Sequence, residues 1–262
     1  MIPFKVEGAI FDVDDTLLDN KPGNHGGAGL HEKARLRAAH EVGKKYNIQK
    51  LINLSTLDNL NAFVNAPVHT LEAAVWEILL LVGVADTRII NRENAIFKEI
   101  VHLKDKYYKD ILTNEGEEVS GSIAFVRALK KSGIHRLAIA STAIRRDINI
   151  FLTKTKIKIF FPEERVISFE SINHPKPNPE AFNLAFSSLQ ISENMRRQVC
   201  AFEDDPRGVM AAKGAGLFTC AITTRYTKKH LLSCEIPPDF VGESYEEFAE
   251  YFGIKKEFNY LV

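Results

Sequence analysis

The sequence predicts an α/β fold, in which a Rossmann-like parallel sheet core with helices on both faces carries an inserted all-helical cap domain. Short apolar runs alternate with helical patterns, as is typical of parallel strands joined by crossover helices. The apolar runs lie near residues 8–11, 136–140, 164–168, 198–202 and 217–222. The helical patterns between the last four lie near 144–154, 179–189 and 206–214, and one more precedes them near 121–132.

The region between Asp19 and Glu118 has a different character, because it contains helical patterns and no convincing strand. Those patterns lie near 30–46, 56–65, 70–83 and 89–110. A turn-rich link at 20–29 precedes them, and Thr113–Glu118 resembles a return linker. We therefore expect a core domain at 1–19 and 118–262, with a helical cap domain at 20–117 over the carboxyl ends of the strands.

Composition indicates a soluble enzyme rather than a nucleic-acid or membrane protein. The chain has 262 residues with 34 Lys plus Arg and 34 Asp plus Glu, so its net charge favours neither partner. The most apolar stretch, Ala73–Ala85, is too short to span a bilayer. The three cysteines, Cys200, Cys220 and Cys234, lack CxxC spacing and indicate buried thiols of a reducing compartment. We expect no signal peptide before the first strand and therefore a cytoplasmic location. Nothing in the sequence indicates the oligomeric state.

Two aspartates, Asp12 and Asp14, directly follow the first apolar run. In an extended chain their side chains point the same way, so the pair favours a divalent cation with oxygen ligands. A bound cation would also neutralise phosphate oxygens, which indicates phosphoryl transfer with Asp12 as nucleophile and Asp14 as general acid and then base. An aspartate-rich turn is the alternative.

Three later segments favour the same chemistry. Ser141 and Thr142 end the run at 136–140 just before a helix, where they can hold an anion or cap the helix. Lys176 is flanked by three prolines, which favours a fixed ammonium over a solvated loop lysine. Just beyond it, Asn178 is expected to cap a helix that has Pro179 at its first position.

The third of these segments places acids after the strand at 198–202. Asp205 and Pro206 fit an N-cap and first helical residue, so Asp205 has a structural reason to be present. We expect Asp204 to face the metal directly. Glu203 either binds the metal too or orients the metal ligands without binding the ion itself.

The order DxDxT, Ser, Lys-Pro and Glu-Asp-Asp resembles the haloacid dehalogenase superfamily, most closely the helical-cap branch with phosphoglycolate phosphatases and β-phosphoglucomutases. The resemblance covers residues 5–19 and 118–225. It implies Asp12 as nucleophile, Asp14 as acid and base, and Ser141 and Lys176 as phosphate ligands. It further implies a Mg²⁺ site made by Asp12, the backbone carbonyl of Asp14, Asp204 and Glu203. Thr16 would position Asp14. Asp205 departs from the serine often found at its position.

These assignments predict a Mg²⁺-dependent phosphatase that hydrolyses a small phosphorylated metabolite through an aspartyl-phosphate. A sugar-phosphate mutase is the first alternative, although we find no arginine-containing cap segment of the kind typical of mutases. A non-catalytic binding protein of the same fold is a second alternative, disfavoured because Asp12, Asp14, Lys176 and Asp204 are all present. Dehalogenation is disfavoured because relatives with that chemistry lack the second acid.

Overall fold

The computed structural model describes residues 4–20, 29–67 and 70–259. Its contacts divide the chain into two compact units, one formed by Met1–Asp19 and Glu117–Val262 and the other by Asn20–Gly116. Most of the link expected at 20–29 lies outside the described residues. None of the described helices is long and apolar enough to cross a membrane.

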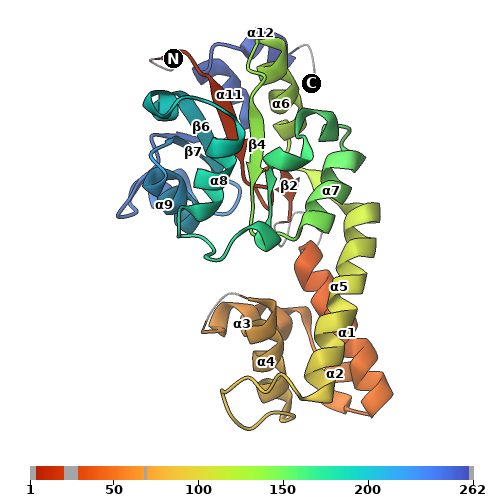
Figure 1. The fold of residues 1–262 in the computed structure, drawn as a ribbon. Coiled ribbons are helices and arrows are strands. Elements are labelled where there is room, and N and C mark those ends of the chain that lie inside the picture. The colour runs from red at the N-terminus through yellow and green to blue at the C-terminus, as the bar shows by residue number, and fades with distance from the viewer. Residues whose placement is uncertain (1–3, 21–28, 68–69, 260–262) are drawn as a thin grey trace. The chain divides into compact units, whose positions relative to one another are not determined.

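The first unit is built on a six-stranded parallel sheet with the strand order β5-β4-β1-β6-β7-β8 (Figure 1). The strands are β1 (Gly8–Phe11), β4 (Leu137–Ala140), β5 (Val166–Ile167), β6 (Val199–Glu203), β7 (Phe218–Ile222) and β8 (Phe240–Gly242). All five predicted strands are present. The predicted fold class is therefore confirmed.

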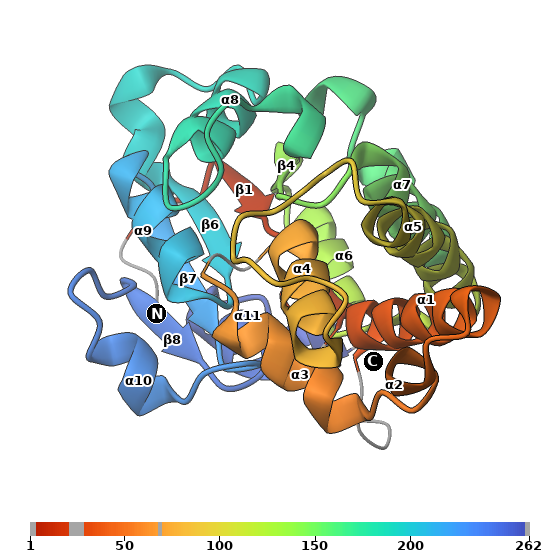
Figure 2. The same ribbon diagram turned by 90° about the horizontal axis from the view of Figure 1, so that it is seen from below.

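Helices cover both faces of this sheet, because neighbouring residues of each strand point to opposite sides. Ile10 packs with Phe182 and Phe186 in one apolar cluster, whereas the ring of Phe11 lies 6.5 Å from that of Phe125. Figure 2 shows α8 (Glu180–Ser188) and α9 (Pro206–Gly214) on the first face and α6 (Ser122–Lys131) and α11 (Tyr245–Tyr251) on the second. The remaining helices of the unit are α7 (Arg145–Lys154), α10 (Lys228–Leu232) and α12 (Lys255–Asn259), with 3₁₀ turns at Lys158–Phe160, Glu163–Arg165, Phe169–Ser171 and Glu193–Gln198.

The structure corrects the expected return linker. The helix before it continues to Glu115, and Glu117–Glu118 then forms strand β3, which pairs antiparallel with β2 (Leu18–Asp19). Strand β8 and helices α10 to α12 were also not expected. These elements are three to seven residues long, which is too short for a hydrophobic period to be recognised.

The second unit is all helical. It contains α1 (Leu30–Tyr46), α2 (Gln49–Ile52), α3 (Thr56–Asn65), α4 (Leu71–Val82) and α5 (Ala95–Glu115). Three of the predicted ranges agree with α1, α3 and α4 to within one residue. The fourth, expected at 89–110, is displaced because the side chain of Asn94 accepts hydrogen bonds from the backbone of Ile96 and Phe97 and so begins the helix there.

A buried polar contact joins α1 to α3 inside this unit. Arg35 donates from Nε to Oδ1 of Asn59 (2.6 Å), and the amide of Asn59 donates to the carbonyl of Glu32 (3.0 Å). Since all three residues are buried, these hydrogen bonds satisfy groups that would otherwise destabilise the unit.

Candidate active site

A tight turn follows β1 and carries the first aspartates. The carbonyl of Val13 accepts hydrogen bonds from the amides of Thr16, Leu17 and Leu18, and Asp15 adopts a left-handed backbone conformation with φ of 58°. Asp12 is buried at the start of this turn, where its amide donates to Phe202 of β6. Its carboxylate therefore lies at the carboxyl end of the sheet.

Lys176 reaches the same place from the proline-rich segment. Its Nζ lies 2.5 Å from Oδ1 of Asp12 and 2.5 Å from Oε1 of Glu203, and the side chain is buried. Arg207 of α9 donates to the carbonyl of Lys176 (2.7 Å) and so fixes the backbone of this segment. The ammonium is consequently held between two carboxylates rather than solvated in a loop.

Glu203 is confined by its neighbours. One carboxylate oxygen accepts from Lys176, and the other accepts from the amide of Asp204 (3.3 Å). A Cβ atom on Gly208 would lie 2.0–2.2 Å from this carboxylate, so only glycine leaves room for Glu203 beneath the first turn of α9.

Asp12, Glu203 and Asp204 together suit a metal ion. Each offers a carboxylate oxygen within 4.8 Å of the others, and all three side chains are buried. Oδ2 of Asp204 has no hydrogen-bond partner among the described residues, which is unusual for a buried carboxylate. With these acids ionised and Lys176 protonated, two negative charges remain, and a divalent cation with oxygen ligands would balance them.

The electrostatics of the four groups agree with this fit. Burial raises the pKa of Asp12 above its usual value although Lys176 opposes the shift, and burial raises the pKa of Glu203 to about 8. The pKa of Asp204 is raised by burial and by the charge of Glu203. Burial disfavours the ammonium of Lys176, but the charges of Asp12 and Glu203 outweigh burial and raise its pKa. The protein alone thus leaves its carboxylates short of positive charge.

Ser141 directly follows β4, the strand next to β1. Because Phe11 is paired with Ile139, Ser141 and Asp12 follow neighbouring strands at the same sheet edge. Ser141 is buried and its hydroxyl accepts from the amide of Ala143 (3.1 Å), while Thr142 is exposed. Neither caps α7, whose N-cap is Ile144.

The other expected residues are placed as follows. Asp14 is half-buried in an isolated bridge with Leu18, and its carboxylate is not part of the cluster formed by Asp12, Glu203 and Asp204. The hydroxyl of Thr16 donates to Oδ1 of Asp204 (3.4 Å), whereas the sequence led us to expect that it positions Asp14. Asp205 caps α9 through the amide of Arg207 (2.8 Å), as expected.

The helix-cap expectation for Asn178 is displaced by one residue. Pro179 is the N-cap of α8, and the side chain of Asn178 accepts from the amide of Glu180 (3.0 Å). Asn178 still satisfies a free amide at the start of the helix.

Sequence reasoning did not single out three residues that contact the turn after β1. Thr224 donates to the carbonyl of Asp15 (2.5 Å), Arg225 lies 3.6 Å from Oδ2 of Asp15, and Tyr245 donates to the carbonyl of Thr16 (2.7 Å). Thr224 and Arg225 come just after the predicted strand at 217–222. Their place at a strand's carboxyl end was the available signal.

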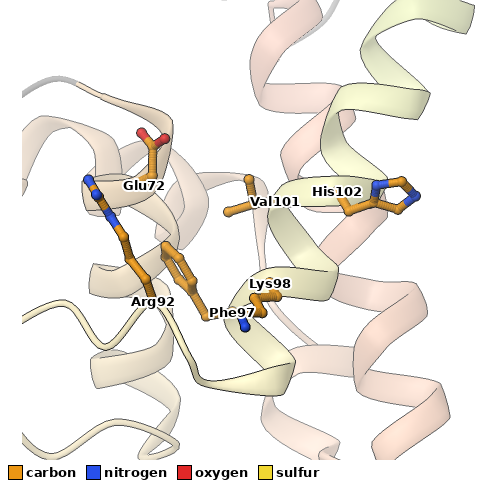
Figure 3. A pocket seen from close by; sticks show the side chains of 6 residues that line it. All are labelled: Glu72, Arg92, Phe97, Lys98, Val101 and His102. Carbon is orange, nitrogen blue, oxygen red and sulfur yellow. The ribbon is translucent and has the colours of Figure 1, made fainter.

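A surface groove of about 540 Å³ in the helical unit lacks the features of the carboxylate cluster. It is lined by Glu72, Arg92, Phe97, Lys98, Val101 and His102 (Figure 3). Its single acid is Glu72, and the ring of His102 points away from the other side chains. The groove contains no paired carboxylates, so the candidate chemistry lies in the α/β unit.

Comparison with known proteins connects this geometry to a family. A family model described as haloacid dehalogenase-like hydrolase matches residues 6–216, a range that includes Asp12, Lys176 and Asp204. A solved structure of a hydrolase of this family from Entamoeba histolytica superposes with a TM-score of 0.70 at 21% identity, covering 97% of this chain and 99% of that one.

The curated relatives include phosphatases by name. A pyrophosphatase from Bacillus velezensis is 32% identical over 48% of this chain, and the match spans only 56% of that protein's length. A phosphorylated carbohydrates phosphatase from Thermotoga maritima is 27% identical over 81% of this chain and 82% of its own length.

Proposed function

This chain belongs to the haloacid dehalogenase-like hydrolases, and on that premise we propose that it is a Mg²⁺-dependent phosphatase of small phosphorylated metabolites that acts through an aspartyl-phosphate. The resemblance based on four sequence motifs is confirmed by the family match. The observation that carries the proposal is the contact of Lys176 with both Asp12 and Glu203, beside Oδ2 of Asp204, which has no hydrogen-bond partner in the described part of the chain.

In the proposed first step, a carboxylate oxygen of Asp12 attacks phosphorus and the bond to the ester oxygen breaks. Asp14 gives a proton to the departing oxygen. Lys176 and Ser141 bind phosphate oxygens, and Thr142, the residue after Ser141, is a further phosphate contact. Thr16 orients Asp204. Asp12, the carbonyl of Asp14, Asp204 and Glu203 would hold Mg²⁺, which when bound neutralises charge on the phosphoryl group.

In the second step, Asp14 removes a proton from a water molecule. The water oxygen attacks phosphorus, the acyl-phosphate bond breaks, and inorganic phosphate and the Asp12 carboxylate are released. The buried ammonium of Lys176 is suited to this cycle, because it stays protonated while charge moves between phosphate and carboxylate.

We also propose the division of labour between the domains. Residues 1–19 and 118–262 would form the catalytic core domain, and 20–117 a cap domain that selects the substrate. The division of contacts after Asp19 and before Glu117 supports these boundaries.

Phosphate release from a panel of phosphorylated sugars and other small monoesters tests the proposal. We expect release with Mg²⁺, none with a chelator, and none from the Asp12→Asn variant. A sugar-phosphate mutase would instead release almost no phosphate and would interconvert isomers once a bisphosphate is added. The name of the Thermotoga maritima relative favours the phosphatase.

A further inference from the structure

Residues that follow the family match in the sequence contact the turn that carries Asp14. The match ends at residue 216, whereas Thr224 and Tyr245 lie after it. Their hydroxyls donate to the carbonyls of Asp15 (2.5 Å) and Thr16 (2.7 Å), across 209 and 229 residues of sequence. Arg225 adds a charged contact to the side chain of Asp15 at 3.6 Å.

This turn needs support from outside itself. The left-handed conformation of Asp15, with φ of 58°, is disfavoured for a residue with a Cβ atom by about 1 kcal/mol or more. Asp15 and Thr16 are also buried, so their carbonyl groups require hydrogen-bond donors. Thr224 and Tyr245 supply those donors.

We propose that Thr224 and Tyr245 are positioning residues of the metal centre. Asp14, whose carbonyl is a metal ligand in the proposed function on which this inference rests, directly precedes Asp15. Thr16 directly follows Asp15 and donates to Asp204, another proposed ligand. Hydrogen bonds to the carbonyls of Asp15 and Thr16 therefore fix the backbone that follows the Asp14 carbonyl. The same hydrogen bonds fix the position of Thr16, whose hydroxyl contacts Asp204.

The two donors come from different elements and act on adjacent peptides. Thr224 lies in the loop after β7, while Tyr245 is the first residue of α11 and is fully buried against Phe125. Substitutions that remove only the hydroxyl groups therefore test the hydrogen bonds and not the packing of the two side chains. Removing one hydroxyl should loosen the turn and leave the apolar contacts of the side chain in place.

Calorimetric titration of the full chain with Mg²⁺ alone, without substrate, tests the inference. We expect Thr224→Val and Tyr245→Phe each to raise the Mg²⁺ dissociation constant about fivefold or more, the effect of one lost hydrogen bond. The matched controls are Thr223→Val and Tyr251→Phe, which change a neighbouring threonine and a tyrosine of the same helix and should leave Mg²⁺ binding unchanged. Turnover of p-nitrophenyl phosphate by the two control variants at saturating Mg²⁺ should stay close to that of the wild type.

The outcomes separate this inference from the proposed function. If the wild type binds Mg²⁺ and both hydroxyl variants bind it as tightly, Thr224 and Tyr245 do not position the centre, and the phosphatase proposal stands. If the wild type itself fails to bind Mg²⁺, the metal centre of the proposed function is wrong, and this inference is overturned with it. If Tyr245→Phe does not fold, the titration of Thr224→Val decides the matter.

Discussion

Asp12 is the proposed nucleophile, and Lys176, Glu203 and Asp204 converge on its buried carboxylate. Asp12→Asn keeps nearly the same shape but is a poor nucleophile. We expect turnover to fall by several orders of magnitude, as when a covalent route is lost. Circular dichroism should show an unchanged fold. A variant that retains a tenth of the wild-type rate would contradict the role of Asp12.

Asp204 and Glu203 differ in how many of their oxygens are already used. Both oxygens of Glu203 accept hydrogen bonds, whereas Oδ2 of Asp204 has no partner among the described residues. Asp204→Asn should therefore raise the Mg²⁺ concentration needed for half-maximal activity more than Glu203→Gln does.

Asp205→Asn is the matched control for this comparison, because asparagine also caps helices and the substitution should change the Mg²⁺ requirement little. If Glu203→Gln proves the more damaging substitution in a Mg²⁺ titration, Glu203 is the principal ligand and Asp204 supports it.

At the scale of elements, helix α9 depends on a single glycine. A methyl group at Gly208 would lie 2.0–2.2 Å from the carboxylate of Glu203 and displace it from Lys176. We expect Gly208→Ala to lower the free energy of unfolding by about 1–3 kcal/mol, as overpacking does, and to reduce activity.

Gly214 of the same helix provides the control. A Cβ atom there would meet Pro179 at an ordinary 3.4 Å, so Gly214→Ala should be neutral or stabilise by up to about 1 kcal/mol. Urea denaturation measures both variants. Equal effects would show that the close approach of Glu203 to Gly208 is not what requires glycine.

Asp239, the residue before strand β8, forms ion pairs and hydrogen bonds that hold this strand against the sheet. Asp239 pairs with Arg197 (3.0 Å) and Lys213 (2.8 Å) and accepts from the amide of Thr219 (2.7 Å). Burial of Asp239 opposes ionisation, but the hydrogen bonds from Arg197, Lys213 and Thr219 outweigh burial and lower its pKa. Its ionised form is thus preferred in the folded state.

A lowered carboxyl pKa stabilises the fold above the unfolded pKa of about 4, and this contribution is lost as the pH falls through the folded value. Asp239→Asn should therefore destabilise at pH 7, by about 1 kcal/mol or less because solvent screens the partly exposed pairs. Urea denaturation at pH 7 and near pH 3 should show the deficit shrinking at the lower pH. A deficit that is constant with pH would contradict the charge-based explanation.

Sequence reasoning predicted elements well where caps and periodicity coincide. Asp205 and Pro206 marked the start of α9 correctly, whereas α5 was expected at 89–110 because Asn94 was not recognised as its cap. Helix α11 was missed although Ser244 caps it through the amide of Glu247, a signal too local to stand out without a longer apolar period.

At the scale of the whole molecule, the sequence predicted which strand ends meet but not how their side chains connect. Parallel topology brings Asp12, Ser141 and Asp204 to one sheet edge, and this follows from alternating strands and helices. The contact of Lys176 with Glu203 and the close approach of Gly208 to Glu203 depend on three-dimensional distances. The spacing of these residues along the sequence does not reveal such distances. The cytoplasmic location remains a prediction.

We propose that Asp12 carries the phosphoryl group and that Asp14 moves the protons. Asp14→Asn should still react with p-nitrophenyl phosphate, because p-nitrophenolate departs with little need of an acid, but attack by water should stay slow. Intact-protein mass spectrometry after mixing should then show a gain of one phosphoryl group in Asp14→Asn that is absent from the Asp12→Asn/Asp14→Asn double variant. An unmodified Asp14→Asn protein that still releases p-nitrophenolate, or a mass gain that persists in the double variant, would contradict the account.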